Sequence, residues 1–315
     1  APGAEPAAAR APAPHPPYVG SGSPLSNVGT LTNQGIELEV GYKLSVDKVN
    51  LSFLANASYV KNEIKNLGNQ TGYIDKESLP TLGTVSRNQN GYPFGYFFGY
   101  KAIGVFQTQE EIDNYISPAT GKPIQPNAVP GDTKFEDLNG DGVISDDNED
   151  RTMIGKPNPD WIVGLTVAAD WNGFDLSAFF QGSFGADVFD ALRRYELAAV
   201  NYTSDALERW TGPGTSNSMP RIVLGDTPKN FRPSTLLVHD ASFLRLRNLQ
   251  VGYTLPAQLT RKAYIQRLRF YASFDNLLTI TGYKGMDPEI GSTMGIDKGV
   301  YPQARVYTFG LNLTF

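Results

Sequence analysis

The sequence predicts an all-β fold, a transmembrane antiparallel β-barrel wall with long extracellular loops. The first observation is composition: the 315 residues include 32 Gly, 22 Pro, 16 Tyr and 17 Phe, a bias toward strands and turns. The second is an alternation of apolar and polar residues in segments about ten residues long, as in outer-membrane strands. The third is that short and long connections between these segments strictly alternate, which is the rule for such barrels.

Seven segments alternate in this way, because successive side chains of a strand point to opposite faces. In chain order they are residues 36–44, 49–60, 161–171, 174–181, 243–255, 266–278 and 304–315. In segment 243–255 the apolar phase moves from Leu244 and Leu246 to Leu249 and Val251. This slip predicts a β-bulge near Asn248.

The connections between the segments are of two kinds. Short ones are expected at 45–48, at Asn172–Gly173 and at 256–265, and long ones at 61–160, 185–242 and 279–303. Because transmembrane barrels have short periplasmic turns and long extracellular loops, this parity places the C-terminal Phe315 on the periplasmic side.

A soluble antiparallel sheet with one polar face would give the same alternation. Two features favour the membrane barrel. Aromatic residues such as Trp161, Trp171, Tyr59 and Tyr307 stand at strand ends, where interfacial girdles belong. In addition, seven strands with such long loops cannot close a wide barrel alone, and an open edge in lipid would leave main-chain groups unpaired, so the chain is expected to be part of one.

Charge and composition exclude several function classes. With 27 basic and 32 acidic residues the net charge is -5, so nucleic acid is not an expected partner. There is no Cys, and His15 and His239 are the only histidines, which leaves no thiolate site and little for histidine chemistry. No nucleophile or phosphate-binding motif indicates an enzyme. Residues 1–17 are rich in Ala and Pro and are expected to lie outside any domain.

One motif carries metal chemistry, the stretch DLNGDGVI at residues 137–144. Its spacing of oxygen-bearing side chains, with Gly at the sixth position, matches the start of a calcium-binding loop, although the twelfth position is Asn instead of Glu. The predicted ligands of a structural Ca²⁺ clip are Asp137, Asn139, Asp141, Val143, Ser145, Asn148 and Glu149. The alternative is an acidic, solvated turn whose side chains bond to the backbone.

An aromatic run with interleaved glycines occupies residues 92–100. Such rings can stack on a sugar face or an apolar side chain, but in a large loop they more often pack the loop onto the barrel rim or a partner. The candidate substrate or partner residues are Tyr96, Phe97, Phe98, Tyr100 and Trp210.

Eight segments of the sequence resemble one known family. They are residues 25–40, 92–107, 131–144, 151–165, 173–185, 242–256, 267–289 and 301–315. In the same order they resemble the C-terminal part of SusC/RagA-type TonB-dependent outer-membrane transporters of Bacteroidetes. The resemblance begins near residue 20 and implies that residues 18–315 are the C-terminal portion of a plugged barrel of roughly 22 strands.

The resemblance implies TonB-dependent active import of oligosaccharides or peptides across the bacterial outer membrane, with no enzymatic activity. It also implies a multi-pass location in outer-membrane lipid and a SusD-like surface lipoprotein as partner. TonB would be engaged through an N-terminal region outside these residues. One alternative is a secreted or surface β-domain that binds calcium and glycans without transport, and another is a barrel that assists assembly or secretion.

Overall fold

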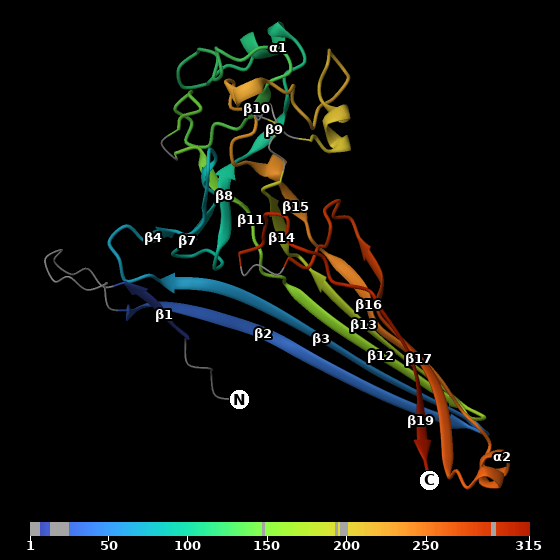
Figure 1. The fold of residues 1–315 in the computed structure, drawn as a ribbon. Helices are drawn as coiled ribbons and strands as arrows, with labels where there is room; N and C mark the ends of the chain where they lie inside the picture. Colours follow the sequence, from blue (N-terminus) through green and yellow to red (C-terminus); the bar gives the residue numbers. More distant parts are fainter. Residues whose placement is uncertain (1–6, 13–24, 147–148, 193–194, 196–200, 291–293) are drawn as a thin grey trace, which may run out of the picture.

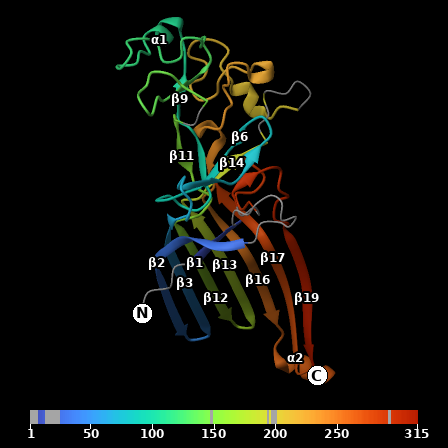
Figure 2. The same cartoon turned by 90° about the vertical axis from the view of Figure 1, so that its left-hand side faces the viewer.

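The computed structural model describes residues 7–12, 25–146, 149–192, 195, 201–290 and 294–315, and its main feature is one large sheet with a layer of loops at one end (Figure 1). The sheet has eight antiparallel strands in the described part of the chain, and their spatial order follows the sequence. The strands are β1 (Ala7–Pro12), β2 (Leu25–Val46), β3 (Val49–Asn66), β12 (Trp161–Trp171), β13 (Phe174–Phe184), β16 (Phe243–Thr254), β17 (Arg267–Thr281) and β19 (Val306–Thr314). Figure 2 shows β2 to β19 side by side below the loops.

All seven predicted segments are strands of this sheet, with β2 and β3 longer than expected. The prediction for the N-terminal segment missed one strand. Residues 7–12 form β1, which pairs with residues 25–31 of β2. Main-chain pairing needs no apolar side chains, so an Ala/Pro-rich composition does not reveal it, and Pro12 is placed at the end of an edge strand, where a missing donor is tolerated.

The short connections are confirmed. At Asn172–Gly173 both residues have positive φ, 48° and 87°, as a tight two-residue hairpin turn requires. Residues 256–265 contain the short helices α2 (Ala257–Thr260) and η5 (Arg261–Ala263). Figure 1 shows α2 and the C-terminus together at the end of the sheet opposite the loop layer.

The bulge is also confirmed, at Arg247. On one side Phe179 and Phe180 pair with Asn248 and Leu246, so Arg247 is skipped, and the register against β17 shifts at the same place. Because of the extra residue, the apolar side chains of β16 change from even-numbered to odd-numbered positions and still point to the same face of the sheet.

The apolar face of the sheet is exposed. Ile36 and Phe309 are 73% and 75% exposed, and Leu311 is 58% exposed. A water-soluble sandwich would bury such side chains against a second sheet, so the structure disfavours that alternative. Among the described residues, no helix is long and apolar enough to cross a membrane.

The three long connections fold together into a loop layer, which we define as the described residues of 67–160, 185–242 and 282–305. The first connection contains β4 (Tyr73–Asp75), β5 (Ser78–Leu79), β6 (Gly83–Thr84), β7 (Ser86–Gln89), β8 (Tyr96–Tyr100), β9 (Ala102–Val105), α1 (Gln109–Asp113), β10 (Thr133–Phe135) and β11 (Arg151–Gly155). The other two contain β14 (Asp187–Asp190), η2 (Ser204–Glu208), η3 (Leu224–Asp226), η4 (Thr235–Leu237), β15 (Val238–Asp240) and β18 (Ile296–Asp297).

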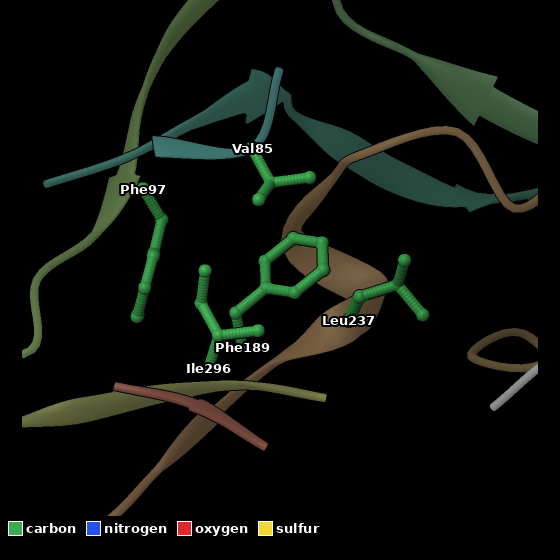
Figure 3. Packing of buried hydrophobic residues seen from close by; sticks show 5 residues of the cluster. All are labelled: Val85, Phe97, Phe189, Leu237 and Ile296. Atoms are coloured by element: carbon green, nitrogen blue, oxygen red, sulfur yellow. The ribbon is translucent and has the colours of Figure 1, made fainter. Parts of the chain in front are cut away.

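The largest apolar cluster of the described residues lies in this layer and joins all three connections. Figure 3 shows Val85 and Phe97 from the first, Phe189 and Leu237 from the second, and Ile296 from the third, with their side chains gathered in one space. Main-chain bonds reinforce the junction, because β14 pairs with both β15 and β18. The loops therefore form a packed body rather than separate excursions.

We predict that Leu237→Ala loosens the loop layer while leaving the sheet intact. Leu237 is 2% exposed, and truncating a buried Leu costs about 2–5 kcal/mol. The matched control is Leu224→Ala in the same connection, where the side chain is 64% exposed. Limited proteolysis should show faster cleavage within 185–242 for Leu237→Ala only, and equal cleavage of the two variants would contradict the assignment of this core.

Candidate functional site

The aromatic run of the first connection is buried. Tyr96, Phe97, Phe98 and Tyr100 are each at most 4% exposed, and they form strand β8. In this arrangement they present no free ring face to a ligand, so the structure favours the packing alternative. Trp210 is half-buried, donates from its indole N–H to Gln107 at 3.2 Å and lies against Gly131.

Guanidinium groups stack on these rings. Arg87 lies 3.6 Å from the ring centroid of Phe98, and Arg151 lies 4.3 Å from the same centroid. Arg232 lies 4.8 Å from the centroid of Tyr100. Burial raises the pKa of the Tyr100 phenol, against the opposing effect of the Arg232 charge, and burial lowers the pKa of Arg151. Cation–π attraction is strongest when desolvated, so these stacks stabilise the layer.

The predicted cation loop bonds largely to itself. Asp137 accepts from the backbone N–H of Gly140 and of Gly142, both at 2.8 Å. The Asn139 amide donates to the carboxylates of Asp141 and Glu149 at 3.0 and 2.9 Å. Among the described residues, no group of three or more acidic or histidine side chains is placed to hold a metal ion.

The remaining predicted ligands are only partly described. Val143 donates its backbone N–H to Asp141 at 2.8 Å, and the carbonyl of Ser145 accepts from the Tyr100 hydroxyl at 2.7 Å. Asn148 lies outside the described residues. Sequence reasoning did not assign a role to Asp150, which is fully buried and accepts from the backbone of Leu138 and Ser145 at 3.1 and 2.9 Å, closing the loop at its base.

A buried ionic clamp ties the third connection to the sheet at the bulge. Arg245 is 2% exposed and donates to Asp287 at 2.5 Å and to Glu289 at 3.0 Å. Arg247 donates to the same Glu289 at 2.6 Å. At this place in β16, two arginines therefore meet two carboxylates that the returning loop supplies.

Two cavities lie within the loop layer and share Lys229 and Arg232 in their walls. One, of about 680 Å³, lies between segments 120–128, 142–144 and 227–232. The other, of about 620 Å³, includes Tyr100, Asp146 and Arg151. Of the described residues in these walls, only Tyr100 and Val143 were predicted from the sequence as site residues, and the cavities themselves were not predicted, since their walls come from two different connections.

No protein-family model matches the chain. It is 32% identical over 320 residues to TonB-dependent receptor P3 of Formosa agariphila. This match covers 96% of this chain and 31% of that receptor. The chain is 30% identical to the TonB-dependent receptor SusC of Bacteroides thetaiotaomicron, over 92% of this chain and 27% of SusC. The chain is homologous to SusC-type TonB-dependent receptors.

Solved structures agree with this assignment. The structure of the RagAB peptide transporter matches with a TM-score of 0.72 and 27% identity, over 96% of this chain and 31% of that one. The predicted family resemblance and the fold class, part of an antiparallel β-barrel, are thereby confirmed. This SusC homologue spans about a third of the length of the curated relatives it matches.

We predict that Asp287→Ala releases the third connection from the sheet. It would leave the buried Arg245 charge without its closest carboxylate, and removing one partner of a buried pair costs about 3–5 kcal/mol. The control is Glu77→Ala in the first connection, which removes the exposed ion pair of Glu77 with Lys298 of the third connection at 3.2 Å and should cost no more than about 1 kcal/mol. Hydrogen exchange should rise over 282–303 for Asp287→Ala alone; similar exchange in both variants would show that the clamp contributes little.

Proposed function

We propose that the protein containing these residues imports a nutrient across the bacterial outer membrane in a TonB-dependent way. The observation that carries the proposal is the exposed apolar face of an eight-stranded sheet in a chain homologous to TonB-dependent receptors over nearly all its length. Large apolar side chains on this face match the hydrocarbon of a bilayer, as they do on outer-membrane strands.

In this proposal the sheet is barrel wall and the loop layer is extracellular. The short connections and the C-terminus share one end of the sheet, which the barrel rule assigns to the periplasm. The outer strands of the sheet, β1 and β19, each have one edge with no partner among the described residues. In lipid such an edge must be paired, so further strands of the same barrel are expected to complete it.

We propose oligosaccharides or peptides as cargo and a SusD-like surface lipoprotein as partner. Support comes from similarity to SusC and to a structure described as a peptide transporter. TonB would act through parts of the protein other than these strands and loops. The rival function, a calcium-binding surface domain that binds glycans without transport, is disfavoured because a soluble domain would not leave Ile36, Phe309 and Leu311 exposed.

Deleting the gene in its native bacterium tests the import function. We expect loss of growth on one or more oligosaccharides or peptides as sole nutrient, restored by the wild-type gene, and abolition of uptake by a protonophore. Uptake of a small sugar through porins serves as control. Release of the protein without detergent, or nutrient uptake that continues in the deletion strain, would refute the proposal in favour of the surface-domain alternative.

We also propose that the loop at residues 137–149 binds Ca²⁺ as a structural clip. Its oxygen donors suit a hard cation, and Asp141 and Glu149 already converge on one donor, the Asn139 amide. A cation there would take the place of that amide between the two carboxylates. Asp137, the first residue of the motif, orders the turn through its two backbone hydrogen bonds.

We predict that Ca²⁺ raises the thermal stability of the loop layer and that Asp141→Asn removes the effect. Binding to the folded state alone stabilises by about 2.7 kcal/mol at a hundredfold excess over Kd. Asp141→Asn keeps an oxygen that can accept from Val143 but removes the charge, and Asp113→Asn in α1 is the control. Thermal unfolding in Ca²⁺ and in EDTA measures the shift, and identical midpoints for the wild type would rule the site out.

A further inference from the structure

The two cavities share Lys229 and Arg232 in their walls, and the guanidinium group of Arg232 is held in a fixed position. Arg232 lies between two rings, 4.8 Å from the centroid of Tyr100 and 4.9 Å from that of Phe135. Its Nε donates to the carbonyl of Lys229 at 3.2 Å. The plane of the guanidinium is therefore held by its neighbours before any ligand arrives.

One end of this guanidinium lacks a hydrogen bond. Nη1 of Arg232 is buried without a hydrogen-bond partner among the described residues, and Asp146 is 3.8 Å away, beyond hydrogen-bond distance. A buried donor left unpaired costs about 1–3 kcal/mol. An oxyanion entering at this wall would satisfy it, and a planar guanidinium is well suited to a carboxylate.

The charge of the lining favours an anion. The cations are Lys122, Arg151, Lys229 and Arg232, and the carboxylates are Asp132, Asp146 and Asp226. Asp132 is neutralised by Arg221 at 2.6 Å, and Asp226 accepts the backbone N–H groups of Asn230 and Phe231. Lys229 is paired with Asp146. The exposed Lys122 has no ion pair among the described residues, so positive charge remains available.

The larger cavity also offers an apolar surface of a particular kind. Its lining includes Pro123, Pro126, Val143, Ile144 and Pro228 and contains no aromatic ring among the described residues. Flat sugar faces are usually held against aromatic rings, whereas aliphatic and proline side chains pack well against aliphatic side chains. The lining of the larger cavity therefore favours a peptide over a glycan, while the smaller cavity does have rings in its wall, those of Tyr100 and Phe231.

We propose that these two cavities together, which we call the double cavity, are a peptide-binding site. In this site Arg232 donates to a ligand carboxylate, and the proline-rich wall holds a neighbouring apolar side chain. Lys122 supplies the surrounding positive charge, whereas Lys229 holds Asp146 in an ion pair at the wall that the two cavities share. The inference rests on the proposed import function, because it takes the bound peptide to be the cargo that is imported.

Binding to the complete protein, purified in detergent, tests the site. The probes are the tripeptide Leu-Ala-Val as free acid, the same tripeptide as C-terminal amide, and trigalacturonic acid, each followed by calorimetry. We expect the free acid to bind about 10- to 100-fold more tightly than the amide, the range for a charged hydrogen bond. Equal affinities of acid and amide, or binding of trigalacturonic acid in place of the peptide, would overturn the proposal.

Variants locate the binding. Arg232→Gln should weaken the free acid about 10- to 100-fold and leave the amide nearly unchanged, while Arg232→Lys should recover only part of the loss because it lacks the planar fork. If limited proteolysis shows that Arg232→Gln disturbs the fold of the loop layer, Lys229→Gln gives a second test, because Lys229 lies outside the ring stack. Arg209→Gln, exposed in the same connection and outside both cavities, is the control. Unaltered affinity in both Arg232→Gln and Lys229→Gln would refute the site.

The import function and this site fail in different ways. Peptide binding that persists in a protein whose deletion leaves uptake intact would refute import and keep the site. Uptake that depends on the gene, together with no discrimination between acid and amide, would refute the site and keep import.

Discussion

Main-chain pairing between neighbouring strands is the constraint on which the rest of the structure depends, because the sheet, as far as the structure describes it, has no apolar core of its own. The buried apolar clusters of the described residues lie in the loop layer or at its border with the strands, while the sheet exposes residues such as Ile36 and Phe309. In lipid this is a stable solution, since every paired N–H and C=O is satisfied by the adjacent strand and the apolar face needs no protein partner. Each strand pairs with the next sheet strand along the chain. From β2 onward, short turns join the strands at one end of the sheet and the packed loop layer joins them at the other.

The contrast between the regular sheet and the irregular loop layer explains which features the sequence could predict. A period of two is visible within ten residues, so the seven strands, the tight turns and the bulge near Asn248 were all accessible. Strand β1 was not, because its pairing uses main-chain groups in a segment without alternation. The order within the long connections was not accessible either: Val85 meets Leu237 and Ile296 in the core, and no local pattern announces contacts between residues so distant in the chain.

The aromatic run shows how a local pattern can be read in two ways. Glycines between rings suit a stacking platform for a ligand and also suit a strand that is approached closely by another segment. At Gly99 a Cβ atom would lie 2.4 Å from the carbonyl oxygen of Pro233, and the next residue, Tyr100, donates its N–H to that same carbonyl at 2.8 Å. The glycine is therefore needed for close packing. The arginines that cover the rings, Arg87 and Arg151, lie outside the run, which is why the sequence left the choice open.

The sheet and the loop layer are stabilised by different interactions, and this separation bears on which parts of the chain can vary independently of each other. Among the described residues, the double cavity is lined by the first two connections, whereas the clamp of Arg245 with Asp287 and Glu289 joins the third connection to the sheet. Substitutions that reshape the cavity need not disturb the clamp, because the two share no residue. Strand pairing in turn does not depend on the side chains that line the cavity. Under the proposed peptide-binding role, a change at Arg232 or at the proline-rich wall should therefore alter which ligands bind while the strands keep their register.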